Sequence, residues 1–453
     1  MKISRLLAVA AIPGVIYCSA QAMAAVTPEE AQQLKTTLTP LGAEKAGNAG
    51  GTIPAWTGGD SDATGLAATK NAPDKFSSDA KVVTINASNV AQYASKLPAG
   101  ALALMKLYPT WHIDVYPTHR TGGAAPAWVY ANTFQNATRA QLRAPNAVTG
   151  AFGGIPFPIP KDGREIVWNN NLHWEGTASF SKYSTYVVPS GGRPSLSGTN
   201  AVSIYKPYYD PKFNVDNYGG MIQLIRIQYS EPANRDGEEI LAWNPANLDA
   251  QQEMVWQYLT GQRRLRRAPN LAYDGVYPDC GGFMNTDENR VFFYQTDRYN
   301  MKIIGKREMY IPYNVNKLQN YTPSAVMKPN FVDPDAVRWE LHRVWDVDMT
   351  LVPGARHVVP HRHVYFDEDT WEAVAADEYD TQGRLWKFNV AYMYNQPTVP
   401  TVFNGTGTIY DLTSGGYCLN QYGYTGSNRE YDLVAPQPMS FFQPDTVAAD
   451  ASR

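Results

Sequence analysis

The sequence predicts a mainly β protein with a few helices, built as one large, strongly curved antiparallel sheet around its own interior. From about residue 165 the hydrophobic pattern alternates with a period of two, and turn signals recur at short intervals. Helical patterns occur only early in the chain and are too few to cover the aromatic faces of so many strands. A sheet that curves on itself covers those faces most economically, with the N-terminal helices as a plug or lid.

The chain begins with a segment typical of a secretory signal peptide, predicted over residues 1–24. Lys2 and Arg5 precede an apolar run from Leu6 to Ile16, and cleavage is expected after Ala24. The run is shorter than the roughly 20 apolar residues that a transmembrane helix needs. We therefore expect a protein exported to the periplasm, and the pattern leaves association with the outer membrane open.

Residues 25–163 are predicted to form a helical and extended arm. Thr27 and Glu30 make a capping-box pattern, which predicts a helix that ends near Leu38. A second helical pattern covers about residues 88–107. The stretch between them is rich in glycine, proline and asparagine, which favours an extended conformation.

Residues 164–453 are predicted to form the curved sheet, and the clearest strand runs from Arg338 to Leu351. Apolar and polar side chains alternate along it, which indicates a long antiparallel strand with one solvated face. Further strands separated by turn signals are predicted at 221–229, 240–243, 254–259, 263–267, 357–366, 371–379 and 384–394. The length of 453 residues would fit about three domains of roughly 150 residues, but barrels and sandwiches run larger. We predict a single domain over residues 25–453.

Two cysteines remain once Cys18 is removed with the signal peptide. Cys280 and Cys418 both lie in glycine-rich loops, and two thiols in an oxidising compartment are the smallest set that can form a disulfide. Two free thiols are the alternative, because pairing cannot be deduced from sequence alone.

The charge balance and the motifs argue against several classes of function. The chain has 39 Lys and Arg against 42 Asp and Glu, whereas nucleic-acid binders usually carry a strongly basic domain. The Gly-x-Ser-x-Gly, dinucleotide-binding and Walker-type motifs are absent. We therefore predict no nucleic-acid partner and no cofactor.

Three histidines form the best metal motif in the sequence. His357, His361 and His363 occupy positions of the same parity, so on one strand their imidazoles would project to the same side. A solvated strand face is the alternative, and the helical context that makes such spacing specific for zinc is missing. We keep the three histidines as a secondary hypothesis and predict no resident metal.

Carboxylate pairs leave a second class of function open. Asp346 with Asp348, and Glu372 with Glu378, could supply the two acids of glycoside hydrolysis. An exported, aromatic-rich β protein therefore also fits a polysaccharide-active hydrolase or binding protein. Ordinary solvation of a strand face produces the same pattern for the two aspartates.

One dense basic run follows the strand predicted at 254–259. It consists of Arg263, Arg264, Arg266 and Arg267. The guanidinium groups could contact an anionic lipid headgroup or an acidic partner. Protection of an edge strand against edge-to-edge pairing is the alternative.

Several motifs, in order along the chain, resemble a single family of exported proteins from bacteria with two membranes. They include Pro40–Asn48, Ile53–Gly59, Gly153–Pro160, Gly261–Arg264, Tyr310–Asn314 and Arg338–Trp345. On these motifs the chain is identified as a member of the domain-of-unknown-function family DUF1329, often labelled outer membrane lipoprotein-sorting protein. The resemblance covers essentially the whole mature chain.

The resemblance implies a fold similar to the periplasmic lipoprotein carriers LolA and LolB. These are incomplete, strongly curved antiparallel barrels with helices at the mouth and an apolar cavity for acyl chains. The resemblance also implies two partners, an exporter of the resistance-nodulation-division class and a protein associated with the outer membrane. The family has no established catalytic residues, so none is assigned here.

We therefore predict a non-enzymatic periplasmic carrier or chaperone for a lipid, a lipoprotein or another hydrophobic molecule. Its predicted cavity lining comprises the large side chains on apolar strand faces, Trp256, Tyr258, Trp339, Leu341, Trp345, Met349, Trp386 and Phe388. The four arginines would contact the headgroup or a partner. A solid core without a cavity is the alternative for the same large residues, and a ligand-free structural adaptor of an envelope complex is a further alternative function.

Overall fold

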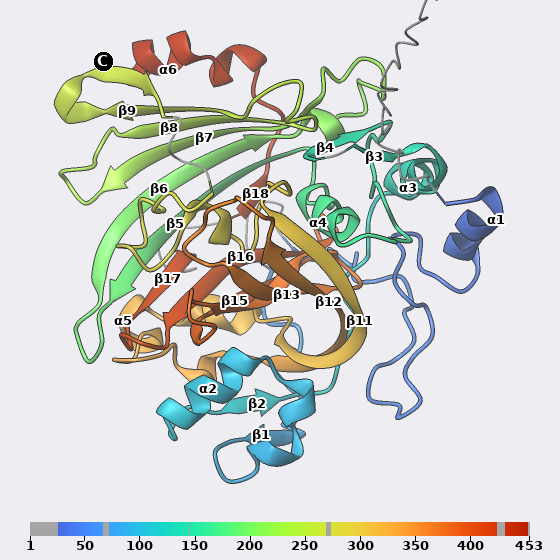
Figure 1. Ribbon diagram of the computed structural model, residues 1–453, viewed down its shortest axis with the longest axis vertical. Helices are drawn as coiled ribbons and strands as arrows, with labels where there is room; N and C mark the ends of the chain where they lie inside the picture. Colours follow the sequence, from blue (N-terminus) through green and yellow to red (C-terminus); the bar gives the residue numbers. More distant parts are fainter. Residues whose placement is uncertain (1–25, 67–71, 144, 269–272, 424–430, 452–453) are drawn as a thin grey trace, which may run out of the picture.

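The computed structural model describes residues 26–66, 72–143, 145–268, 273–423 and 431–451. The predicted signal peptide lies outside these residues. Within them, one sheet of 16 strands dominates the molecule and curves without closing into a barrel (Figure 1). The predicted mainly β fold with a strongly curved, incomplete barrel is therefore confirmed. No helix in the described ranges is both long enough and apolar enough to cross a membrane.

The sheet has two halves that meet where β17 (Tyr417–Tyr422) pairs with β5 (Ala178–Val188). From its edge inward, the first half contains β1 (Val83–Ile85), β2 (Ile113–Val115), β12 (Trp339–Leu351), β13 (His361–Asp367), β14 (Ala373–Tyr379), β15 (Leu385–Gln396) and β16 (Thr401–Asp411). Outward from β5, the second half contains β6 (Ser195–Tyr205), β7 (Met221–Glu231), β8 (Glu239–Pro245), β9 (Met254–Leu259) and β10 (Arg264–Arg267). β11 (Tyr299–Pro312) pairs with β12, and β18 (Tyr431–Leu433) pairs with β5. β3 (Gln141–Arg143) and β4 (Ala147–Thr149) form a separate hairpin.

The sheet is mixed, which corrects the expectation of a purely antiparallel one. Val115 of β2 pairs with Trp339 of β12 in the parallel direction, whereas the other described ladders are antiparallel. The arm produces this exception, because β2 reaches the sheet from the N-terminal side and runs beside the start of β12. The backbone amide of Tyr116 continues the contact by donating to the carbonyl oxygen of Trp339 at 2.9 Å.

Curvature arises at irregular positions along the longest strands. In β11 the register with β12 shifts between Ile303 and Gly305, and Gly305 has a φ of 149° that other residues rarely adopt. Such bulges bend a strand and increase its twist. The paired β11 and β12 accordingly follow a pronounced arc (Figure 1).

The structure contains most of the predicted strands within a few residues of their predicted bounds. The strand predicted at 357–366 differs, since β13 begins only at His361. Pro360 precedes that residue and has no amide proton for a ladder hydrogen bond, which accounts for the late start.

The described helices are short, and the longest lies in the arm. They are α1 (Pro28–Ala31), α2 (Ala99–Leu107), α3 (Ala127–Arg139), α4 (Gly163–Asn171), α5 (Pro323–Val326) and α6 (Pro444–Ala451). The helix predicted from Thr27 has the expected capping box but continues only as a 3₁₀ turn to Lys35. In the region predicted as helical over 88–107, the 3₁₀ turns Val90–Gln92 and Ala94–Lys96 end before Pro98, and α2 begins after it. Sequence reasoning missed α3 and α4.

Helix α2 covers one face of β14 and β15. The carboxylate of Asp377 accepts hydrogen bonds from the backbone amides of Ala99 and Gly100 at 2.8 and 2.6 Å, which holds the helix start on the sheet. A side chain at Gly100 would collide with Phe388, so glycine permits the close approach. At the far end of the sheet, α6 lies over β8 and β9 (Figure 1).

Part of the interior of the curve is occupied by the segment 273–298, which we call the interior segment. Its side chains contact strands of both halves, because Asp279 accepts from Tyr229 of β7 while Glu288 pairs with Lys387 of β15. Helix α4 adjoins this segment through Asn170 and has eight of its nine residues buried. The plug of the barrel therefore consists of α4 and the interior segment, while α2 packs on the opposite face of the sheet.

A disulfide joins the interior segment to the wall of the sheet. It links Cys280 to Cys418 of β17, 138 residues away, and both sulfur-bearing side chains are buried. Such a link restricts the unfolded chain strongly, because it closes a long loop.

The polar face of β12 is buried near the start of the strand, which corrects the prediction of a solvated face there, whereas Thr350 near its end is exposed. Glu340 and His342 are both at most 1% exposed. The arm covers them, since the backbone amide of His119 donates to Glu340 at 2.8 Å. Arg338, which pairs with Glu340 at 2.6 Å, also binds Asp79 of the arm at 2.6 Å. Several of the motifs that resemble the family lie in this arm, which docks on the sheet.

We expect loss of the disulfide to lower the free energy of unfolding by about 2–5 kcal/mol. The variant carrying both Cys280→Ala and Cys418→Ala should unfold at lower urea concentration than the oxidised wild type, as followed by tryptophan fluorescence. Dithiothreitol should destabilise the wild type to a similar extent and leave the double variant unchanged. Equal stability of oxidised wild type and double variant would contradict the structural role of the bond.

Candidate functional site

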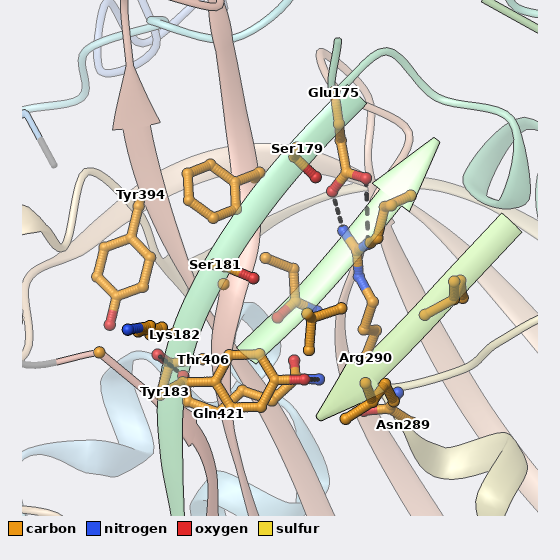
Figure 2. A pocket seen from close by; sticks show the side chains of 18 of the residues that line it. Glu175, Ser179, Ser181, Lys182, Tyr183, Asn289, Arg290, Tyr394, Thr406 and Gln421 are labelled. Carbon is orange, nitrogen blue, oxygen red and sulfur yellow. Dashed lines mark hydrogen bonds and ion pairs between the residues drawn. The ribbon is translucent and has the colours of Figure 1, made fainter. Parts of the chain in front are cut away.

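A pocket lies inside the curve of the sheet, between β5, β6 and β7 on one side and β16 with the interior segment on the other (Figure 2). Its cavity volume is about 190 Å³. Side chains from both halves of the sheet and from the interior segment meet there. The pocket therefore exists only because the interior segment leaves part of the curve unfilled.

One wall of the pocket is apolar. It is formed by Val202 and Ile204 of β6 together with Ile225 and Ile227 of β7. Alternate residues of a strand share a face, and the register places Ile204 opposite Ile225 and Val202 opposite Ile227. The four side chains consequently form one continuous patch.

The neighbouring strand gives the pocket a polar side. Ser179, Ser181 and Tyr183 of β5 line it from alternate positions, and Figure 2 shows the first two pointing into the cavity. The phenol oxygen of Tyr183 accepts from the side-chain amide of Gln421 at 3.1 Å. The cavity is thus apolar on β6 and β7 and hydrogen-bonding on β5.

A buried cluster of five charged side chains closes one end of the pocket. Arg290 of the interior segment pairs with Glu175 and, at 3.2 Å, with Glu372 (Figure 2 shows the first pair). His173 bridges the same carboxylates at 3.0 and 3.1 Å. Lys206 adds a further contact to Glu175 at 2.7 Å.

Electrostatic coupling sets the charges in this cluster. Burial alone would lower the pKa of His173, but the carboxylates of Glu372 and Glu175 outweigh it and raise that pKa to about 9. Burial likewise opposes ionisation of Glu175, yet Arg290, Lys206 and His173 hold its pKa well below the usual range. At neutral pH three cations therefore face two carboxylates, and the end of the pocket carries an excess positive charge.

The backbone that presents Arg290 is strained. Arg290, Val291 and Tyr294 have φ angles of 53°, 71° and 85°, in the left-handed region that favours glycine. Each such residue costs on the order of 1–3 kcal/mol and persists only where its surroundings impose it. Strain of this kind concentrates at functional sites.

A second hollow, of about 580 Å³, lies in the arm. Its walls comprise Leu34, Lys35, Leu38, Pro40, Lys45, Trp56, Tyr130, Ala131, Phe134 and Gln135. It lacks the buried charges and the strained backbone of the interior pocket. We therefore take the interior pocket as the candidate functional site.

The eight predicted lining residues lie elsewhere, and none of them borders either hollow. Trp339, Leu341, Met349 and Phe388 belong to the main hydrophobic core, and Trp345 packs against it. Tyr258 is buried, Trp386 is half-buried, and Trp256 packs against a second core with α6. The aromatic stripes in the sequence thus predicted faces that are buried in the core. The strands β5 and β7 border the pocket with serines and isoleucines and have no such aromatic stripe.

The three predicted histidines do not converge. His357 precedes β13 and is buried beside Asp287 of the interior segment at 3.2 Å. His361 and His363 do lie together, and Asp348 of β12 stands between them. The proline-delayed start of β13 separates His357 from the other two.

The predicted carboxylate pairs are engaged in different places. Glu372 belongs to the pocket cluster, while Glu378 lies against Glu288 of the interior segment, and burial together with Glu288 raises the pKa of Glu378 well above its usual range. Asp346 and Asp348 pair with the histidines of β13.

The predicted basic run forms the edge of the sheet. Its members Arg263, Arg264, Arg266 and Arg267 are exposed on and beside β10, the last strand in the order. This position fits both readings of the run, an interaction surface and a protected edge.

Comparison with known proteins identifies relatives along nearly the whole chain. The family model described as "Protein of unknown function (DUF1329)" matches residues 84–448. A curated relative, uncharacterized protein PA3922 of Pseudomonas aeruginosa, is 36% identical over 457 residues, covering 96% of this chain and 98% of the relative.

Among solved structures, two similar ones have TM-scores of 0.43. One is a DUF1329 family protein from Desulfovibrio piger, 14% identical, covering 63% of this chain and 97% of its own. The other is a putative outer membrane lipoprotein-sorting protein domain from Vibrio parahaemolyticus, 11% identical, covering 64% and 98%. A LolA superfamily protein, NE2245 of Nitrosomonas europaea, is 11% identical with a TM-score of 0.37 and covers 63% of this chain and 100% of its own.

We expect the charged cluster to make the free energy of unfolding decrease as the pH becomes alkaline. The pKa of His173 is raised from 6.5 to about 9 in the folded chain, so its contribution is fully present below pH 6.5 and is lost as pH rises through 9. The loss should amount to about 3 kcal/mol, measured by urea unfolding between pH 6 and 10. The variant His173→Gln should lack this part of the pH dependence. Parallel curves for variant and wild type would refute the assignment.

Proposed function

This chain belongs to the DUF1329 family, whose function is unknown, and from that premise we propose that it is an exported, non-enzymatic carrier of the periplasm. Its cargo in this proposal is an amphipathic molecule of the lipid class, either free or as the acyl group of a lipoprotein. The interior pocket holds the cargo.

The proposal rests on one observation: the pocket is apolar along one wall and positively charged at one end. Val202, Ile204, Ile225 and Ile227 offer a continuous apolar wall, and the cluster around Arg290 supplies excess positive charge at one end. An apolar chain along the wall gains about 0.8 kcal/mol for each methylene group removed from water. An anionic group at the Arg290 end gains charge-assisted hydrogen bonds.

The size of the pocket limits what it encloses. Its volume of about 190 Å³ lies below the roughly 300–1,000 Å³ typical of small-molecule sites. We therefore propose that the pocket encloses one end of the cargo, with the remainder extending through its mouth.

The carboxylates of the pocket favour carriage over glycoside hydrolysis. A general acid needs a pKa raised toward the working pH. The pKa of Glu175 is instead held well below its usual range by Arg290, Lys206 and His173 against the effect of burial. Glu372 is likewise paired with Arg290 and His173. Both carboxylates thus orient cations and lack the freedom of a catalytic pair.

We assign partner contact to the edge strand β10. Arg263, Arg264, Arg266 and Arg267 are exposed there, and guanidinium groups pair readily with carboxylates and phosphates. In this proposal the surface meets the lipid headgroup or the envelope partners that the family resemblance implies, an exporter of the resistance-nodulation-division class and an outer-membrane-associated protein.

Native mass spectrometry of the mature protein purified from its own periplasm tests the carrier. We expect a co-purifying adduct that lipid extraction identifies as an amphiphile. The variant Ile225→Trp should reduce its occupancy at least tenfold, because the indole fills the apolar wall. Ile304→Trp is the matched control, since Ile304 is 53% exposed on β11, away from the pocket. A ligand-free mass, unchanged after incubation with envelope lipid extract, would refute the proposal.

The charged end predicts a preference among amphiphiles. The affinity for a fatty acid should be at least about tenfold higher than that for the fatty alcohol of equal chain length, because a charged hydrogen bond contributes about 1.5–3 kcal/mol. Competition against a fluorescent fatty acid measures both affinities. Arg290→Gln should abolish the preference, and equal affinities in the wild type would exclude anion recognition at Arg290.

A further inference from the structure

A second cluster of side chains lies outside the pocket, on a face shared by β12 and β13. Asp348 stands directly opposite His363 in the register, and His361 lies two residues earlier on the same face. Nε2 of His361 is 2.6 Å from Oδ1 of Asp348, and Nε2 of His363 is 3.3 Å from the same oxygen. Two imidazoles and a carboxylate from neighbouring strands therefore converge on one point.

Neighbouring side chains hold both rings in this orientation. Oδ1 of Asp346 lies 3.0 Å from Nδ1 of His363. When His363 is neutral and donates from Nδ1 to Asp346, its Nε2 is unprotonated and is available to a metal ion. The ring of His361 stacks on Tyr379 with centroids 4.8 Å apart. Asp346 thus occupies the position of the carboxylate that orients a metal-binding histidine.

We propose that Asp348, His361 and His363 bind a divalent transition-metal ion of the Zn²⁺ class, with Asp346 as the residue that positions His363. Two imidazole nitrogens with one carboxylate oxygen suit zinc and its neighbours, whereas Ca²⁺ and Mg²⁺ prefer oxygen ligands throughout. Three protein ligands leave one position of a tetrahedral ion open for water or another molecule.

The spacing of the donor atoms agrees with this assignment. Zinc–nitrogen and zinc–oxygen bonds of roughly 2.0–2.2 Å place tetrahedral ligands about 3.3–3.6 Å apart. The 3.3 Å between Nε2 of His363 and Asp348 matches this separation. The 2.6 Å between His361 and Asp348 has to open by less than about 1 Å, which a side-chain rotation supplies. His361, His363 and Asp348 are 35%, 28% and 24% exposed, so an ion can enter from solvent.

The pairing of Asp348 separates this cluster from the other groups of histidines and carboxylates among the described residues. Three further such groups occur, around His112, His173 and His342. In each of them a cation already binds a carboxylate: Lys81 on Asp114, Lys206 on Glu175, and Arg120 on Asp369. Both ion pairs of Asp348 are with histidines, which a metal can displace or share.

Isothermal titration calorimetry with Zn²⁺ tests the site. The full chain is purified without a polyhistidine tag and treated with a chelator before the titration. We expect saturable binding of one ion per chain in the wild type. Asp348→Asn, His361→Gln and His363→Gln should each abolish it, and Asp346→Asn should weaken it about 10- to 100-fold. Co²⁺ should give the intense visible absorption of a four-coordinate ion in the wild type and lose it in the same variants.

The matched control is His112→Gln, which changes a half-buried histidine of a different carboxylate group. It should leave Zn²⁺ binding unchanged. Circular dichroism of each metal-free variant establishes that it is folded, and the partly exposed Asp348→Asn remains informative if a histidine variant is not. Absence of one-to-one binding in the wild type, binding that survives Asp348→Asn, or binding that is lost in His112→Gln would overturn the proposal.

Discussion

The structure depends on a row of ionisable side chains that faces the inside of the sheet, two of them cationic. Arg362 of β13, Glu378 of β14 and Lys387 of β15 stand side by side in the register, and all three are at most 1% exposed. Buried charges must be paired, because removal of one partner costs about 3–5 kcal/mol. Asp287 and Glu288 of the interior segment supply the partners at 3.2 and 2.9 Å. The segment that occupies the interior of the curved sheet therefore has to supply carboxylates to this row.

The pocket is a consequence of that constraint. The ion pairs to Asp287 and Glu288 fix the interior segment against the first half of the sheet, and the disulfide at Cys280 fixes it against β17. The chain that follows must then turn sharply, and the left-handed conformation of Arg290 accomplishes the turn. The same turn places the guanidinium group at the end of the cavity. The proposed cargo site thus rests on the pairing of charges that do not themselves touch it.

The polar face of β12 has two roles. Near its start the arm covers the polar side chains and buries Glu340 among Arg338, His342 and Asn314. Near its end the same face carries Asp346 and Asp348 with the histidines of β13. A strand with alternating polar residues therefore contributes both to the docking of the arm and to the metal site that we propose. Burial of the first part holds the strand in the register on which the second part relies.

Much of the architecture could be predicted from the sequence, because a period of two and turn residues are local signals. The long strand from Arg338, the meander that follows and the basic hairpin at Arg264 were predicted on that basis. The candidate site could not be, since Glu175, Arg290 and Ile225 lie far apart in the chain and none belongs to a motif. Local patterns determined which residues form strands and which faces are apolar. Only the tertiary structure decided which apolar face borders a cavity, because that depends on where the interior segment finds partners for its buried charges.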